Sequence, residues 1–438
     1  MRKIKSLLYR TAARGEAFLK GVAFDCRACG QCVLSQTGLI CPMSCPKGLR
    51  NGPCGGTLGD RCEVYPDRAC VWMRIYDRTA KDSTQVPPLN PSPDAALFFT
   101  SSYANWWKGI DEGGTTPLTY LDLPKNRVDQ PIATQSRLEA ALKAGRFVKT
   151  CEVRSPRNAD FERLYKEIDY VKDKFDAVNA TAYLNGKPSL PSGRTCIELL
   201  AAGVDAICQS TCRDHTKTSF VSELINNHAN GVHNVLCLTG DSYAGNPRIK
   251  QVFDMDSSLM VFEARHLRET GAIHFTGQTM PEPPKPFIGV AINPFTRPIS
   301  APIRRLKQKI AAGADFTQTQ LIFNLPAFEQ FMNRFCDDGL DRDLFLLAGI
   351  PVVISKSAMK MIPHIPGVDY PNEIRERLEG AADLRDEGIK LARETVRAVS
   401  KMPGVRGVHL MLLGADHSVL PEVVCDIDAL GGACSKHG

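Results

Sequence analysis

Eight cysteines lie between residues 26 and 70 of the chain, and no histidine precedes His215. A metal bound in this stretch would be held by thiolates, which argues against a zinc finger with mixed cysteine and histidine ligands. Glycines and prolines separate the cysteines, as expected of a loop that bends tightly around a metal centre. The predicted metal ligands are Cys26, Cys29, Cys32, Cys41, Cys45, Cys54, Cys62 and Cys70.

The first of these cysteines follow the spacing of iron–sulfur proteins. Cys26, Cys29 and Cys32 supply three thiolates in one short run, and Cys41, which is followed by Pro42, is a candidate fourth ligand. Eight thiolates would suffice for two [4Fe-4S] clusters, or for one cluster and one all-cysteine zinc site. Iron–sulfur is the favoured interpretation, and zinc is the alternative.

Reduced thiols are expected here rather than disulfides. Disulfides persist in oxidising compartments, and the N-terminal sequence MRKIKSLLYRTAARGEAFLKG lacks the apolar core of a secretion signal. The other eight cysteines are scattered among apolar residues, as reduced thiols are. We therefore expect a cytoplasmic protein.

The overall composition is that of a globular enzyme. The 438 residues are 43% hydrophobic and 23% charged, which indicates two or three domains. No apolar run reaches the length of about eighteen residues that a membrane span needs, and a net charge of +6 does not indicate nucleic-acid binding. The segment before Cys26 is more basic, which favours either docking of an acidic electron-carrier protein or the solvated face of an amphipathic helix.

A change of composition divides the chain. Residues 83–95 are rich in proline, serine and asparagine and are predicted to be a linker. We expect a cysteine-rich module at 1–82, a connecting segment at 83–132 and a catalytic domain at 133–438. In the connecting segment, Trp106 and Trp107 are expected to cover one domain with another.

Beyond the linker, eight short apolar runs alternate with amphipathic stretches of helical period. This alternation favours an α/β fold, the (β/α)8 barrel of TIM type, over an open doubly wound sheet. No Gly-x-Gly-x-x-Gly motif opens a helix, so a dinucleotide site of the Rossmann type is not supported. The runs cover residues 147–153, 176–182, 205–211, 234–240, 287–293, 316–323, 344–352 and 405–413.

In such a barrel the catalytic groups lie at the C-terminal ends of the strands. Glu152 lies at the C-terminal end of the first run and Asp241 follows the fourth, and both stand among amide and hydroxyl side chains. Two acids on a polar rim are typical of acid–base catalysis, although each acid could equally be a solvated strand-end charge. The other residues at these ends are Thr181, Gln209, Gly240, Asn293 and Gln320.

Two parts of the chain resemble known proteins. The barrel segment resembles methylenetetrahydrofolate reductases from about residue 133 to 430, through motifs in the family's order: KTCEVRSP, DAVNATA, QSTCRDHTK, LCLTGDS, VAINP and LKQKIAAGADFTQTQLIFN. The Thr-Gly-Asp and AGADFxxTQ elements are specific to that family. The cysteine pattern CxxCGQCxLxxTGxxCPMxCPKxLxNGPCGG resembles the small subunit that accompanies the reductase in acetogenic bacteria, here on the same chain.

The resemblance implies a role for each matched residue. Glu152 matches the general acid that protonates the folate. Asp241 matches the aspartate between flavin and folate, and Gln320 matches the glutamine that orients the folate and, where one is used, the nicotinamide donor. The remaining matched positions imply contacts with the flavin: Thr181, Gly240 and Lys309.

The chain departs from the family pattern at several predicted cofactor-binding positions. Gln209 and Arg297 stand where many members have histidine, and Asn293 stands where they have tyrosine. The aromatic residue that stacks on folate or nicotinamide is replaced near Ser355. These departures leave FAD and FMN both open and weaken the case for NAD(P)H as donor.

The predicted function is flavin-dependent reduction of 5,10-methylenetetrahydrofolate to 5-methyltetrahydrofolate, or the reverse oxidation, with electrons entering through the N-terminal cluster. One alternative is an NAD(P)H-dependent reductase whose module holds structural zinc. Another is a folate-binding or methyl-transfer accessory protein without redox chemistry. A homo-oligomer is expected in each case.

Overall fold

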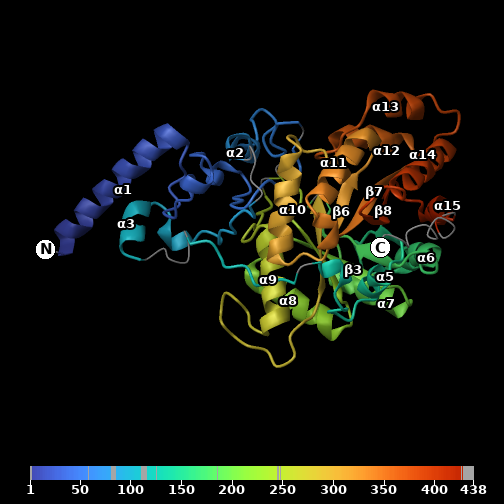
Figure 1. Ribbon diagram of the computed structural model, residues 1–438, viewed down its shortest axis with the longest axis horizontal. Helices are drawn as coiled ribbons and strands as arrows, with labels where there is room; N and C mark the ends of the chain where they lie inside the picture. The colour runs from blue at the N-terminus through green and yellow to red at the C-terminus, as the bar shows by residue number, and fades with distance from the viewer. Residues whose placement is uncertain are drawn as a thin grey trace.

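The computed structural model describes residues 2–57, 59–79, 85–109, 116–124, 126–184, 186–243, 246, 248–425 and 427. The N-terminal part forms a module at one end of the molecule, and the barrel forms the other end (Figure 1). The first helix, α1 (Arg2–Phe24), points away from the barrel in this view.

The cysteine-rich module consists mostly of loops between short helices. After α1 come α2 (Val71–Thr79) and, in the connecting segment, α3 (Ser102–Trp107), whose first turn is capped by the Ser101 hydroxyl. Its small apolar core includes Ile40, Trp72 and Ile75 and continues into Ala301 of a barrel helix. The module is therefore packed directly on the barrel.

Eight parallel strands close into a barrel in which each strand pairs with its neighbours in sequence. Because β8 also pairs with β1, the sheet is closed. This confirms the predicted (β/α)8 barrel and shows that the open doubly wound sheet was wrong. Each strand lies within a residue or two of its predicted run. The strands are β1 (Val148–Val153), β2 (Ala177–Ala180), β3 (Ala206–Thr211), β4 (Asn234–Leu238), β5 (Phe287–Ile292), β6 (Phe316–Leu321), β7 (Phe345–Val353) and β8 (Val405–Leu413).

Helices surround the strands, and one more helix covers the bottom of the barrel. Leu138 and Leu142 of α5 (Arg137–Lys143) pack in one cluster with the first inward-facing residues of the strands. The other helices are α6 (Glu162–Val171), α7 (Ser192–Ala201), α8 (Lys217–Ala229), α9 (Ser257–Thr270), α10 (Ser300–Ala312), α11 (Leu325–Asp337), α12 (Lys356–Met361), α13 (Asn372–Glu379), α14 (Leu384–Val399) and α15 (Leu420–Val424).

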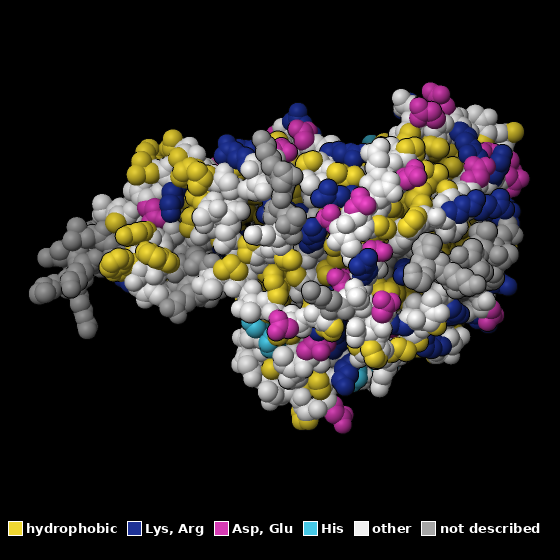
Figure 2. Space-filling view, in the orientation of Figure 1, with side chains coloured by type: hydrophobic (Ala, Val, Ile, Leu, Met, Phe, Trp, Pro, Cys, Tyr) yellow, Lys and Arg dark blue, Asp and Glu magenta, His cyan; other side chains and the backbone are white. Residues whose placement is uncertain are grey.

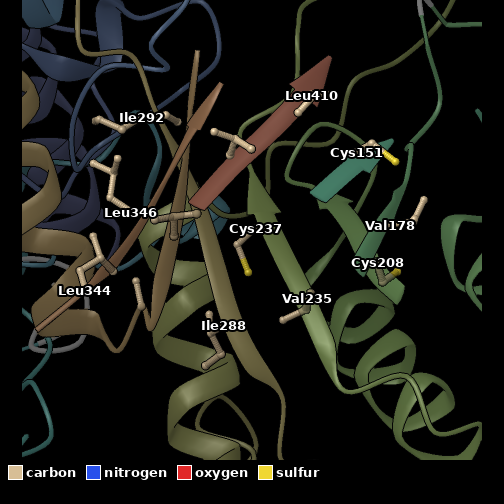
Figure 3. Packing of buried hydrophobic residues seen from close by; sticks show 14 of the residues in the cluster. Cys151, Val178, Cys208, Val235, Cys237, Ile288, Ile292, Leu344, Leu346 and Leu410 are labelled. Carbon is tan, nitrogen blue, oxygen red and sulfur yellow. The ribbon is translucent and has the colours of Figure 1, made fainter. Parts of the chain in front are cut away.

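Alternation along the strands creates two apolar layers. Side chains such as Cys151, Val178 and Cys208 belong to the outer layer between sheet and helices (Figure 3). Inside, Phe287 stacks on Phe316 with their ring centroids 5.0 Å apart. This apolar filling closes the lower half of the barrel, so a ligand can enter only from the C-terminal mouth.

The connecting segment contacts both parts of the molecule: α3 lies beside α1, where Ser102 accepts a hydrogen bond from Lys20 at 2.7 Å, and another stretch packs on the barrel. Leu89 is fully buried in the barrel's outer core, and its carbonyl accepts a hydrogen bond from the Leu118 amide. The expectation for the two tryptophans was wrong, because Trp106 and Trp107 remain 62% and 74% exposed. Figure 2 shows hydrophobic side chains, in yellow, gathered on the surface at the module end of the molecule.

Of the helices that the structure describes, none combines the length and the apolar character needed to cross a bilayer.

Candidate functional site

A cavity of about 270 Å³ opens at the C-terminal mouth of the barrel. Barrel side chains form most of its wall, and the cysteine-rich module closes one side with Lys47, Cys54 and Glu63. The cavity brings together most of the predicted site residues: Glu152, Gln209, Gly240, Asp241, Asn293, Lys309 and Gln320.

Glu152 stands near the end of β1, directly opposite Asn179 of β2. Burial raises the pKa of its carboxyl group, while the charge of Arg154 and a hydrogen bond with Gln209 oppose the rise. The Gln209 side-chain oxygen accepts the Ala182 amide at 3.3 Å, which holds its amide group in place. Gln209, predicted to contact the cofactor, thus also orients the candidate acid.

Asp241 follows β4 in a tight turn. Its side chain is exposed and lines the cavity. Desolvation by nearby protein atoms raises the pKa of its carboxyl group, and the neighbouring Glu63 adds to the rise, whereas Lys47 and Arg213 oppose it. Gly240 precedes it with φ +84°, where a Cβ atom would lie 2.9 Å from Cβ of Arg213. The turn therefore requires glycine.

Asn293 and Gln320 use their side-chain groups to hold the rim of the cavity. Asn293 Nδ2 donates to the carbonyl oxygens of Gly55 at 3.0 Å and Gly367 at 2.9 Å. Gln320 Nε2 donates to the Pro366 carbonyl at 2.9 Å. Both residues line the cavity, and in this structure their side-chain amides bind the loops that form its rim.

Two buried cations form another wall. Lys309 of α10 donates from Nζ to the Ala291 carbonyl at 2.7 Å, and burial, with the nearby charge of Arg305, lowers its pKa to about 7. Arg305 Nε has no hydrogen-bond partner among the described residues. A wall with a buried, unpartnered guanidinium nitrogen and a lysine that is poorly solvated fits an anionic group such as a flavin phosphate.

Two predicted cofactor residues lie away from the cavity. The Thr181 hydroxyl accepts the Ser155 amide at 3.3 Å behind the rim, and Arg297 is an exposed loop residue. Neither of these described residues lines the cavity, so the geometry does not support a flavin contact for either as placed. The flavin contact of Arg297 was implied by the resemblance alone, whereas Thr181 was also placed at a strand end by the barrel rule.

Several cavity residues were missed by sequence reasoning. His409 of β8 faces the cavity with its Nδ1 3.0 Å from the Thr150 hydroxyl, and burial lowers its pKa to about 3, so it is a neutral imidazole. Arg213 donates to the Asp241 carbonyl at 3.1 Å. Alternation along the eighth strand would have placed His409 inside the barrel. Cys54 was predicted only as a metal ligand, and no sequence pattern predicts that Lys47 and Glu63 line the cavity.

The eight cysteines divide into two groups of four. Cys26, Cys29, Cys32 and Cys41 line one small cavity beside α1. A second cavity, of about 270 Å³, has the other four in its wall: Cys45, Cys54, Cys62 and Cys70. Within the described parts of the chain, no three histidine, cysteine or acidic side chains are arranged so as to hold a metal ion. The metal ligands remain a prediction.

Arg50 is a buried cation beside the first group of cysteines. It is 2% exposed, and Cys29, Cys32 and Cys41 lie close enough to act on its charge. Its Nη2 donates to the Gln31 carbonyl at 2.9 Å, whereas Nε and Nη1 have no partner among the described residues. A buried cation with unused donors fits an anionic, thiolate-bound centre at this position.

The second group of cysteines adjoins the barrel cavity. Lys47, Pro53, Cys54 and Glu63 line both cavities, so they form a shared wall. The Cys54 thiol donates to Glu63 Oε2 at 3.3 Å. The two cavities are thus separated by little more than one layer of side chains.

A closed barrel with two carboxyl groups in a cavity at its C-terminal mouth has the architecture of a barrel enzyme. Residues 137–426 match the sequence profile of the family described as methylenetetrahydrofolate reductase, and the chain belongs to this family. Residues 8–90 match a second profile, described as methylene-tetrahydrofolate reductase C terminal, although this segment here precedes the barrel.

Individual relatives are distant. The chain is 24% identical over 291 residues to a 5,10-methylenetetrahydrofolate reductase of Pectobacterium carotovorum, which covers 64% of this chain and 90% of the relative. It is 26% identical over 181 residues to a probable NADPH-dependent methylenetetrahydrofolate reductase of Caenorhabditis elegans, which covers 40% of this chain and 25% of the relative. The chain thus spans only a quarter of that second relative.

Among solved structures, one similar chain is an uncharacterized protein from Clostridium thermocellum whose description states that it binds two copies of 5-methyl-5,6,7,8-tetrahydrofolic acid. Its TM-score is 0.47 at 12% identity, and the match covers 68% of this chain and 98% of that one.

Proposed function

We propose that this chain reduces 5,10-methylenetetrahydrofolate to 5-methyltetrahydrofolate with a bound flavin. The observation that carries the proposal is the convergence of Glu152 and Asp241 on one cavity at the barrel mouth, in a member of the reductase family. The relatives of known name support the same substrate. The reverse oxidation uses the same groups, because a catalyst lowers the barrier in both directions.

The cavity residues divide the work of binding and proton transfer. Lys309 and Arg305 form the wall that would hold the flavin phosphate, and the flavin, when bound, supplies the hydride. The raised pKa of Glu152 favours its protonated form, from which it would deliver a proton to the folate nitrogen and so open the methylene bridge. Asp241 binds the folate ring from the opposite side of the mouth. Gln209 keeps the Glu152 carboxyl group directed into the cavity.

We further propose that each group of four cysteines holds an iron–sulfur cluster, which would supply one-electron chemistry when bound. The unpartnered donors of Arg50 support this for the first group. The wall shared with the barrel cavity makes the second group the one nearer to the folate site. Sequence reasoning treated the Cys26 group as the source of electrons, whereas its cavity lies farther from the barrel.

The competing proposal is that the module holds structural zinc and NAD(P)H is the donor. Both proposals keep the folate chemistry and differ in the metal and in the donor. An electron-carrier partner and a homo-oligomeric state remain predictions.

One experiment tests the proposed function. The chain is purified anaerobically, its iron, zinc and flavin contents are measured, and formation of 5-methyltetrahydrofolate is followed with reduced viologen or with NADH and NADPH. We expect bound flavin, iron, and product with the one-electron donor. A chain that binds flavin but forms no methyl product with any of these donors would contradict the reductase assignment.

A further inference from the structure

The turn that carries Asp241 is held from both sides by two residues of the cysteine-rich module. Lys47 Nζ donates to the Gly240 carbonyl at 2.8 Å. On the other side of Asp241, the Ser242 amide donates to Glu63 Oε1 at 2.9 Å. Lys47 and Glu63 are joined to each other at 2.6 Å. The three contacts form a closed clamp around one peptide turn.

The side chains of the clamp are buried. The side chains of Lys47 and Glu63 are only 3% and 7% exposed. Burying an ion pair is unfavourable unless its remaining donors and acceptors are satisfied, and such pairs are often better explained by specific positioning than by stability. Beyond the pair itself, these two residues contact the Gly240–Ser242 turn, the Cys54 thiol and the Phe253 ring, whose centroid lies 5.7 Å from Lys47 Nζ.

Attachment of the module to the barrel does not depend on this clamp. Asn51 Nδ2 donates to Asp256 Oδ2 at 2.6 Å, and Arg305 donates to the Asn51 carbonyl at 2.8 Å. Far from the cavity, Arg304 donates to the Thr79 carbonyl at 3.1 Å. These contacts already join the module to the barrel. The Lys47–Glu63 pair is therefore not needed for attachment, and its contacts act locally on the Gly240–Ser242 turn.

We propose that Lys47 and Glu63 are positioning residues of the folate site, which fix the Gly240–Ser242 turn and so hold the Asp241 carboxyl group in the barrel cavity. The inference rests on the proposed function for its substrate, but the clamp itself is a property of the fold. It means that the barrel alone has an incomplete site, because the module supplies the restraint on the Asp241 carboxylate.

The test compares Lys47→Met and Glu63→Ala with Arg304→Met, which removes a module–barrel contact outside the cavity. Two readouts are measured on the full-length, flavin-loaded chain: amide hydrogen exchange of residues 239–242, and the Kd for 5-methyltetrahydrofolate. We expect faster exchange and a Kd raised by about tenfold or more in the two clamp variants, since each loses a hydrogen bond to a charged group. Arg304→Met should change neither.

Conservative variants cover the case in which a clamp variant does not fold. Glu63→Gln keeps an oxygen that accepts the Ser242 amide, and Lys47→Arg keeps a cation that donates to Gly240. Both should keep the exchange rate and the Kd within about threefold of the parent values. The reason is that the hydrogen bonds to the turn are kept, whichever side chain makes them. Larger losses in both would overturn the clamp.

The two readouts separate this inference from the proposed function. Unchanged exchange in Lys47→Met and Glu63→Ala, or an equal increase in Arg304→Met, would show that the pair does not hold the turn. A parent chain that fails to bind 5-methyltetrahydrofolate while its clamp variants still exchange faster would refute the folate site and leave the clamp standing. Faster exchange with unaltered folate affinity would show that the turn is held but does not position Asp241.

Discussion

The side-chain amide of Asn293, at the end of β5, donates a hydrogen bond to the carbonyl oxygen of Gly55 in the cysteine-rich module at 3.0 Å. The same Nδ2 atom donates to Gly367 in the loop before α13. One barrel residue thus joins the module to a second loop at the cavity rim. The rim is therefore built from three segments: the end of β5, the module loop and the loop before α13.

Asn293→Ala should loosen this rim. It leaves two carbonyl oxygens and the Phe295 amide without their partner, and we expect a loss of about 2–4 kcal/mol in the free energy of unfolding. Denaturant unfolding measures the loss, and limited proteolysis should cut the module loops faster. Asn230→Ala, which removes an exposed amide just beyond α8 and its local hydrogen bond to the Asn226 carbonyl, serves as the control and should change stability by less than about 1 kcal/mol. Equal stability of the two variants would mean that the rim is held elsewhere.

Glu152→Gln should remove the proton donor while keeping its size. Turnover should fall by about a hundredfold or more, the scale of general acid catalysis, while flavin binding persists. The pH dependence has a defined sign: the acid acts when protonated, so kcat should decline as pH rises through the raised pKa of Glu152. In Glu152→Gln this decline should vanish. Glu162→Gln on the surface of α6 is the matched control, and near-parental turnover in Glu152→Gln would refute the assigned role.

The sequence was informative wherever a residue's position depends on its own neighbours in the chain. The eight strands follow from short apolar runs, and Glu152 and Asp241 follow from the rule that barrel sites lie at strand ends. Lys47 and Glu63 could not be found in this way, because their partners at Gly240 and Ser242 are brought near only when the module docks. Thr181 was predicted from its strand-end position and from the resemblance, and Arg297 from the resemblance alone, and neither of these described residues lines the cavity.

Lys309 should make flavin affinity depend on pH. Burial lowers its pKa to about 7 in the flavin-free chain, whereas a bound phosphate would favour the charged amine. Binding then requires proton uptake above pH 7, so the flavin Kd should rise with pH, approaching about tenfold per unit. Titration of the flavin-free chain between pH 6 and 9, the range that brackets this pKa, measures the slope.

Lys309→Met should bind flavin more weakly and without this slope. Lys307→Met is the control from the same helix, because Lys307 is paired with Asp338 at 2.6 Å away from the cavity. If the flavin Kd of Lys309→Met still rises with pH, a group other than Lys309 takes up the proton on flavin binding.

The last prediction concerns the two groups of cysteines, and it compares Cys29→Ser with Cys54→Ser. If each group holds a cluster, each variant should lose about half of the iron and of the broad visible absorbance. Both should lose flavin reduction by reduced viologen. Cys336→Ser, which changes a thiol in the barrel, should keep the iron and the flavin reduction.

In Cys29→Ser, flavin that has been reduced photochemically should still convert methylenetetrahydrofolate, because Cys29 lies outside the barrel cavity. A structural zinc site would behave differently, since loss of a ligand would unfold the module without a specific block on electron entry. A parent chain that contains zinc and no iron would exclude the clusters, and a nicotinamide donor would then account for the reduction.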